Sequence, residues 1–191
     1  MNQTEIMNAF ERSDAIRTGH FKLSSGRHSD TYLQCALVLQ HPGIAERLGH
    51  ELGARLSGYE PTVVVGPAMG GVVIAHETAR FLGVRCVFTE RVDGEMTLRR
   101  GFSIQPSERV VVVEDVVTTG RSPREVMDLM HSNGSSVVAV GAIVDRSSGA
   151  AFGVPFEALT TIEAGTWDPD DCPLCASGDE PVAPGSRHLV R

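Results

Sequence analysis

Lysine is almost absent from this sequence of 191 residues. Only Lys22 is lysine among 17 basic residues, so any contact with an anion must depend on arginine and on backbone N–H groups. No apolar run approaches the roughly 18 residues of a membrane-spanning helix, and the N-terminal residues are too polar for a signal peptide. The net charge of -7 opposes general nucleic-acid binding but is compatible with a small phosphorylated ligand. These absences predict a cytoplasmic protein that acts on a small molecule.

Cysteine is also scarce, and the four cysteines do not form a dense disulfide pattern. Cys35 and Cys86 lie in apolar surroundings and are expected in the core. Cys172 and Cys175 have the spacing of half a zinc site. The sequence has no second Cys-x-x-Cys, so Asp or His ligands or a second subunit would have to complete such a site. Two reduced thiols in a terminal extension are the simpler interpretation.

Apolar runs and polar turns alternate along the chain, whose length fits a single domain. We predict helices at about 4–17, 43–57, 71–82 and 122–132, and strands at about 62–65, 84–88, 110–113 and 136–144. A hairpin is expected over 20–35, whereas residues 89–108 show no helix or strand period and are expected to form a mobile loop. Apolar strands that alternate with helices indicate an α/β fold with a mostly parallel central sheet flanked by helices.

Three polar loops follow three of these strands. Their sequences are GPAMGG at 66–71, EDVVTTGRS at 114–122 and DRSSG at 145–149. Because ligands in parallel sheets bind at the carboxyl ends of the strands, we expect the three loops to form one ligand site.

The run VVVVEDVVTTGRS, residues 110–122, combines two carboxylates with a turn of small residues. Glu114 and Asp115 are suited to bind vicinal hydroxyls or to hold Mg2+ through water. The Thr-Thr-Gly turn offers hydroxyls and N–H groups at a helix N-terminus, which suit a phosphate. Alternatively, Asp115 ends a strand and Ser122 is an ordinary N-cap before Pro123. The combination favours binding of a ribose phosphate.

The same run resembles the phosphoribosyl pyrophosphate signature of type I phosphoribosyltransferases, in which two acidic residues precede a phosphate loop. GHFKLSSGRHSDTYLQC, residues 19–35, is similar to the hood segment of orotate phosphoribosyltransferases. Together with VVVGPAMGG, GVRCVFTERV and GAIVDRSSG, the resemblance spans residues 19–149. It implies a type I phosphoribosyltransferase fold as one domain over 1–191, with a small N-terminal hood mainly at 19–40 and a C-terminal extension at about 165–191.

The resemblance implies a role for each matching residue. Glu114 and Asp115 would bind the ribose hydroxyls, with Mg2+ held nearby together with phosphoribosyl pyrophosphate, and Arg146 would contact orotate. His28, within the hood motif, is interpreted as structural, with contact to the base as the alternative. The 5-phosphate loop would comprise Thr118, Thr119, Gly120, Arg121 and Ser122. The pyrophosphate loop would comprise Gly66, Pro67, Ala68, Met69, Gly70 and Gly71, and the hood over the base Ser25, Gly26, Arg27 and Tyr32.

The segment 90–108 departs from the best-known members of the family, which carry lysines and a histidine there. Its available cations are Arg91, Arg99 and Arg100. The resemblance implies that this segment closes as a lid over the active site of the neighbouring subunit in a homodimer. Arg99 and Arg100 would then act with the acidic pair in catalysis by stabilising the leaving pyrophosphate, and Arg91 would bind substrate. A solvated loop with a few arginines is the alternative.

The implied reaction is transfer of the 5-phosphoribosyl group from phosphoribosyl pyrophosphate to orotate, in pyrimidine biosynthesis. One alternative is a phosphoribosyltransferase for another base, such as uracil, xanthine or another purine. The second is a regulator that binds phosphoribosyl pyrophosphate or a nucleotide without turnover.

Overall fold

The computed structural model describes residues 1–23, 25–147 and 149–184, so the expected extension at 165–191 is described only as far as residue 184, and hood residue Ser24 lies outside the described part. The elements in chain order are α1 (Gln3–Arg12), β1 (Ile16–Lys22), β2 (His28–Leu33), α2 (Cys35–Leu39), α3 (Pro42–Leu56), η1 (Ser57–Tyr59), β3 (Val63–Pro67), α4 (Gly70–Leu82), β4 (Arg85–Val92), β5 (Glu95–Leu98), β6 (Arg109–Val117), α5 (Arg121–Ser132), β7 (Ser136–Asp145), β8 (Phe156–Thr161), β9 (Thr166–Trp167), η2 (Pro169–Asp171) and α6 (Pro173–Ala176).

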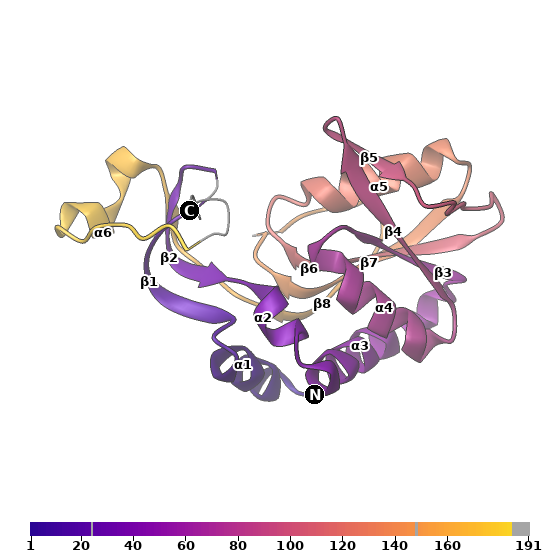
Figure 1. Cartoon of the computed structure of the whole chain (residues 1–191), viewed down its shortest axis with the longest axis horizontal. Coiled ribbons are helices and arrows are strands. Elements are labelled where there is room, and N and C mark those ends of the chain that lie inside the picture. Colours follow the sequence, from indigo (N-terminus) through magenta and orange to yellow (C-terminus); the bar gives the residue numbers. More distant parts are fainter. Residues whose placement is uncertain (24, 148, 185–191) are drawn as a thin grey trace.

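The central sheet has six strands in the order β5-β4-β3-β6-β7-β8. All neighbouring pairs are parallel except β4 and β5, which form an antiparallel hairpin. Helices α3 and α4 cover one face and α5 covers the other (Figure 1). The predicted α/β class and mostly parallel sheet are therefore confirmed.

The valine runs supply both cores of this layered structure. Val64, Val111 and Val113 belong to the core under α3 and α4, whereas Val110 and Val112 belong to the core under α5. This alternation follows from the two-residue period of a strand. A strand that is buried on both faces must be apolar at every position, which explains the continuous valines.

A second, smaller sheet of three antiparallel strands has the order β1-β2-β9. Figure 1 shows it set to one side of the central sheet, with α6 on its outer side. The first two strands form the predicted hairpin, whereas β9 comes from the region after residue 165 and joins through Ser29 and Thr166. The N-terminal hairpin and the C-terminal extension thus build this small sheet together.

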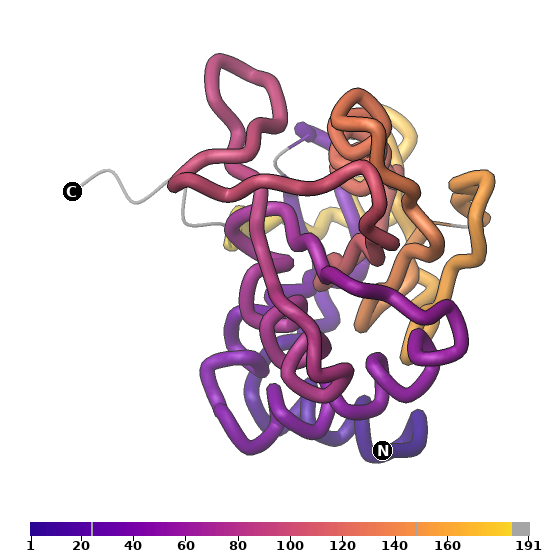
Figure 2. The backbone as a smooth tube through the Cα atoms, turned by 90° about the vertical axis from the view of Figure 1, so that its right-hand side faces the viewer, coloured from indigo at the N-terminus to yellow at the C-terminus, as the bar shows by residue number. Residues whose placement is uncertain are grey.

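Two predictions of local structure were wrong. The first helix ends at Arg12 rather than near residue 17, because Asp14 adopts a positive φ of 54° and the chain then enters β1. The segment 89–108 is not without strands, because β4 continues to Val92 and pairs with β5. Asp93 and Gly94, with φ of 50° and 92°, form the turn of this hairpin, which projects from the body of the molecule in Figure 2.

None of the helices in the described part of the chain has the length and hydropathy required to cross a membrane.

Candidate active site

The three predicted loops lie at one edge of the central sheet. Strands β3, β6 and β7 are adjacent and parallel, so the turns that follow Pro67, Val117 and Asp145 leave the sheet at the same end. The carboxyl ends of neighbouring parallel strands are the usual ligand site of such sheets. The prediction that these three loops lie at the same edge of the sheet is therefore confirmed.

The acidic pair lies within β6 rather than beyond its end, because the strand continues to Val117. Glu114 is only 8% exposed, and Asp115 is half-buried. Burial, together with the adjacent charge of Asp115, raises the pKa of Glu114 to about 9. The backbone N–H of Val116 donates to Oδ1 of Asp115 at 2.8 Å, which fixes the position of that carboxylate. In the absence of a cation, Glu114 is therefore protonated at neutral pH.

The glycine turn between β3 and α4 packs directly against these carboxylates. A Cβ built on Gly70 would lie 2.7 Å from both carboxylate oxygens of Asp115, and one on Gly71 would lie 3.1 Å from Oε1 of Glu114. The close approach of backbone to carboxylate therefore requires glycine at both positions. Pro67 and Gly66 are buried at the end of β3, whereas Met69 is 82% exposed and Ala68 is joined to it by a cis peptide bond.

Carboxylate oxygens are the ligands that Mg2+ prefers. Two adjacent residues supply carboxylates here: that of Asp115 is half-buried and that of Glu114 is buried. The residues present therefore fit a magnesium ion at this edge.

The N-terminus of α5 is formed by the Thr-Thr-Gly turn. Gly120 is the N-cap, with a φ of 72°, and has no side chain to make a capping hydrogen bond. The alternative in which Ser122 caps the helix is wrong, because Ser122 lies inside the first turn. Thr118, Thr119 and Arg121 are exposed. The backbone N–H of Arg121 donates to Oγ1 of Thr119 at 3.3 Å. A helix N-terminus beside exposed hydroxyls is a ready site for a phosphate.

Arg146 connects the end of β7 to the small sheet. Its backbone N–H donates to the carbonyl of Val117 at 2.8 Å, and its Nη2 donates to Oγ of Ser29 at 3.5 Å. Burial lowers the pKa of Arg146, an effect that the nearby charge of Asp30 opposes. A half-buried guanidinium between the two sheets is suited to bind a planar carboxylate.

The predicted hood residues belong to the hairpin of β1 and β2. Ser25, Gly26 and Arg27 lie in the turn between β1 and β2. Arg27 donates to the carbonyl of Thr166 at 3.0 Å and lies 3.4 Å from Asp168, so the C-terminal extension holds its side chain. Tyr32 packs against Phe21 with ring centroids 5.7 Å apart.

Side chains alternate along a strand, so Tyr32 and Ser29 lie on opposite faces of β2. The sequence did not single out Ser29, although Ser29 is the hood residue that contacts Arg146.

The arginines of the predicted lid have acidic partners or face solvent. Arg91 forms an ion pair with Glu125 of α5, which also pairs with Arg121 at 2.7 Å. Arg100 pairs with Glu90 at 2.8 Å, and Arg99 is exposed. Exposed ion pairs are worth only about 0 to 1 kcal/mol, so a polyanion can compete for these side chains.

The cysteines have two different environments. Cys35 is buried beside the acidic pair, and burial and the charges of Asp115 and Glu114 raise the pKa of its thiol, which confirms a core position. Cys172 and Cys175 lie instead beside two histidines, His20 and His28, within the described part of the chain. The sequence interpretation did not consider His20, although the pairing of β1 with β2 brings both histidines to one end of the hairpin.

Comparison with known proteins agrees with this geometry. Residues 38–154 match the family model of the phosphoribosyl transferase domain. An orotate phosphoribosyltransferase of Pelotomaculum thermopropionicum is 54% identical over 190 residues, covering 99% of this chain and 100% of that protein. One of Thermotoga maritima is 49% identical over 185 residues, covering 96% and 99%. The solved orotate phosphoribosyltransferase of Aeropyrum pernix has a TM-score of 0.69 at 28% identity, covering 82% of this chain and 93% of that chain. The chain therefore belongs to the orotate phosphoribosyltransferase family.

Proposed function

We propose that the protein transfers the 5-phosphoribosyl group of phosphoribosyl pyrophosphate to orotate, giving orotidine 5'-phosphate and pyrophosphate in the synthesis of UMP. The observation that carries this proposal is the contact of the acidic pair with the glycine turn at the edge of β3, β6 and β7. The hood reaches the same edge through Ser29 and Arg146. Membership of the orotate phosphoribosyltransferase family, at 54% identity over nearly the whole chain, supports the choice of base.

Three groups of residues bind the phosphoribosyl donor in this proposal. The N-terminus of α5, with Thr118 to Ser122, holds the 5-phosphate through N–H groups and hydroxyls. Glu114 and Asp115 accept hydrogen bonds from the ribose 2- and 3-hydroxyls. The backbone of residues 66–71 approaches the pyrophosphate, since glycine leaves the N–H groups accessible. The site thus spans the whole donor along one sheet edge.

Catalysis follows from positioning and electrostatics. The bond between C1 of the ribose and the pyrophosphate oxygen breaks, and C1 gains oxocarbenium character. N1 of orotate forms the new bond and loses its proton to solvent. Glu114 and Asp115 would hold Mg2+ together with the donor, and the ion would supply positive charge to the leaving pyrophosphate. Arg146 binds the orotate carboxylate and orients N1 toward C1.

The β4–β5 hairpin and the residues after it, over 90–108, act as the lid. Closure exchanges the ion pair of Arg100 with Glu90 for contact with the pyrophosphate, and Arg99 and Arg91 add further positive charge. In our proposal the lid serves the neighbouring subunit of a homodimer in the cytoplasm. Exposed apolar side chains on and before α4, among them Met69 and Val73, support association of two copies. Light scattering of the purified protein should therefore give the mass of a dimer.

The reaction is tested by measuring pyrophosphate release from phosphoribosyl pyrophosphate and Mg2+ with orotate, uracil or xanthine as acceptor. A charged hydrogen bond to the orotate carboxylate is worth about 1.5 to 3 kcal/mol, so orotate should exceed uracil by at least about tenfold in kcat/KM. Preferred use of uracil or a purine would instead make the chain a phosphoribosyltransferase for that base. Binding of the donor without turnover on any base would make it a regulator.

A further inference from the structure

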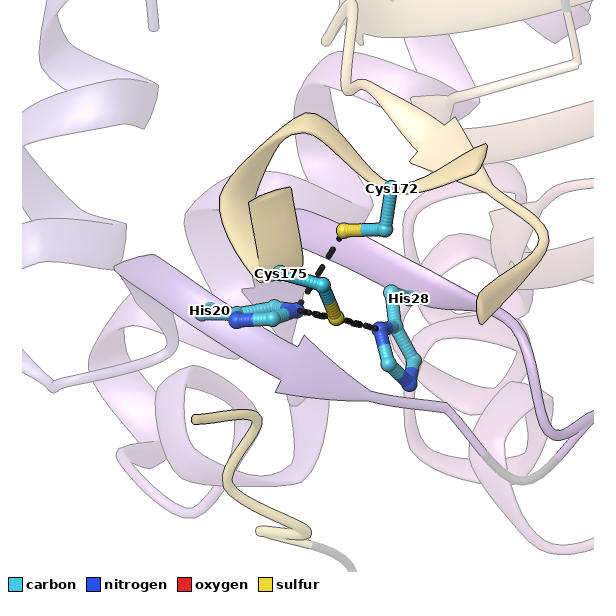
Figure 3. A group of neighbouring side chains, drawn as sticks. All are labelled: His20, His28, Cys172 and Cys175. Carbon is cyan, nitrogen blue, oxygen red and sulfur yellow. Dashed lines mark hydrogen bonds between the residues drawn. The ribbon is translucent and has the colours of Figure 1, made fainter. Parts of the chain in front are cut away.

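Four side chains with metal-binding atoms meet at the junction of the small sheet and the C-terminal extension (Figure 3). His20 comes from β1 and His28 from β2, whereas Cys172 directly precedes α6 and Cys175 lies within it. One ligand atom of each residue lies within 4.8 Å of the others. His20, His28 and Cys172 are at most 5% exposed, so the cluster is closed to solvent on most sides.

The distances between these atoms match the edges of a tetrahedral zinc site. Zn–N bonds of about 2.0 to 2.1 Å and Zn–S bonds of about 2.3 Å give edges of roughly 3.3 Å for N to N and 3.5 Å for N to S. Nε2 of His20 lies 3.1 Å from Nδ1 of His28. Sγ of Cys172 lies 3.4 Å from that Nε2, and Sγ of Cys175 lies 3.8 Å from it and 3.3 Å from Nδ1 of His28. Four of the six edges thus lie within about 0.3 Å of the tetrahedral values, and the other two are below 4.8 Å.

A hydrogen bond to an atom outside the cluster determines which tautomer the neutral His20 side chain adopts. Its Nδ1 lies 2.9 Å from the backbone carbonyl of Asp179, an atom that can only accept a hydrogen bond. The proton of a neutral imidazole must then be on Nδ1, and the lone pair of Nε2 points toward the two thiols and His28. Metal-binding histidines usually donate their other ring N–H to a carbonyl or carboxylate in this way.

We propose that His20, His28, Cys172 and Cys175 bind one Zn2+ as a structural site. Two thiolates and two imidazoles in tetrahedral arrangement favour zinc over magnesium or calcium, which prefer oxygen ligands. All four positions are protein ligands, so the ion has no open position for substrate and holds the fold together.

The proposed zinc joins segments that are far apart in the sequence. His20 and Cys172 are separated by 152 residues, and the ion fixes the extension against the hairpin beside β9. Hood residues 25–27 lie between the two histidine ligands in the sequence, so zinc would also limit the motion of the hood. The effect of zinc on substrate binding rests on the proposed function, in which the hood covers the orotate.

The first test is the metal content of the full-length protein, purified with reductant and without chelator. We expect about one zinc per chain by mass spectrometry. Cys172→Ser and His20→Ala should lose most of this zinc, whereas Cys86→Ser, which changes a half-buried thiol of β4 outside the cluster, should retain it. Zinc that stays in both cluster variants would overturn the assignment.

The second test uses the wild-type protein alone and so does not depend on the folding of variants. Protein stripped of metal and given Co2+ should develop the visible bands of tetrahedral cobalt and the charge-transfer band of cobalt bound to thiolate. Zinc content below about one-tenth per chain together with no cobalt–thiolate band would overturn the proposal. A Cys172–Cys175 disulfide that persists under reductant would also overturn it, in favour of a redox pair.

The structural role is measured by amide hydrogen exchange with and without zinc. Removal of zinc should increase exchange at 16–33 and 166–182 and leave the central strand at 109–117 unchanged. Equal exchange of the hood in both states would overturn the structural role. These measurements do not involve turnover, so they stand even if orotate is not the acceptor. If orotate is the acceptor, zinc loss should raise KM for orotate more than KM for phosphoribosyl pyrophosphate.

Discussion

Replacing Gly70 with alanine adds a single methyl group beside the acidic pair. The new Cβ would lie 2.7 Å from both carboxylate oxygens of Asp115, whereas ordinary contacts begin at 3.4 Å. The carboxylate must therefore retreat by about 0.7 Å, the difference between these two distances. This movement also strains the hydrogen bond of 2.8 Å that Val116 donates to Oδ1 of Asp115.

The substitution should separate activity from stability. A displacement of about 1 Å in a reacting group can cost about 100-fold in rate, so we expect kcat/KM for phosphoribosyl pyrophosphate to fall by about 10- to 100-fold. The free energy of unfolding should change by less than about 1 kcal/mol, because the gain in helix propensity at the exposed first position of α4 offsets the cost of displacing the carboxylate.

The assay is the initial rate of pyrophosphate release with orotate, combined with thermal unfolding of the same samples. Gly43→Ala is the matched control, because a Cβ on Gly43 in α3 meets nothing within 4 Å. We expect wild-type rates from this control. Wild-type kcat/KM in Gly70→Ala would refute the conclusion that the ribose site depends on the position of Asp115. An equal loss in both variants would show that glycine replacement acts in general and not through the acidic pair.

Asp115→Asn should abolish turnover while the melting temperature remains close to wild type, because charge is removed without a change of volume. Arg146→Ala should raise KM for orotate by at least about tenfold and leave donor affinity, measured by calorimetry, nearly unchanged. The double variant Arg99→Ala, Arg100→Ala should have a lower kcat while it still binds the donor. If this variant is mixed with Asp115→Asn protein and the subunits exchange, recovered activity would demonstrate a lid that acts across the interface. Glu114 has a pKa of about 9 in the fold, above its unfolded value, so its stabilising contribution is complete at acid pH and is lost as pH rises through 9. The stability of Glu114→Gln relative to wild type should accordingly increase with pH, by up to about 1.4 kcal/mol per unit, in ligand-free denaturation curves.

The parallel sheet could be predicted because each strand and each turn has its own pattern within a short stretch of sequence. Four valines before Glu114 can only be a strand buried on both faces, and the glycines at 66–71 mark a turn of close approach. Each unit of strand, turn and helix is complete within about 25 residues. The edge that holds the donor could therefore be assembled from the alternation of these units alone.

The errors have physical causes that are also local. Asp93 and Gly94 form the type of turn that joins two antiparallel strands, and Asp-Gly is a strong hairpin signal that was overlooked within a polar segment. Ile16 continues the apolar spacing of α1, but Ser13 and Asp14 end the helix before it. In both places two residues with turn chemistry outweigh the periodicity of their neighbours.

The small sheet and the metal-binding cluster could not be predicted in this way. Ser29 donates to the carbonyl of Gly165 at 2.8 Å across 136 residues of sequence, and β9 is too short to carry a strand pattern of its own. The Cys172–Cys175 spacing indicated half a site, but its other half depends on the path of the C-terminal extension back to β1. Pairing over such distances leaves no periodic signal in either segment.

The two halves of the substrate site consequently differ in how they are held. The edge proposed for the donor belongs to one continuous sheet with cores on both faces. The position proposed for the base is between Arg146 of that sheet and a hood closed by long-range contacts. Because the hood depends on contacts between segments far apart in the sequence, we expect faster amide exchange in the hood than in the central sheet. Changes that weaken the hood, including loss of zinc or of β9, should therefore reduce orotate binding while the donor site remains intact. With this arrangement, changes in the hood can alter the affinity for the base without altering the residues proposed to activate the ribose.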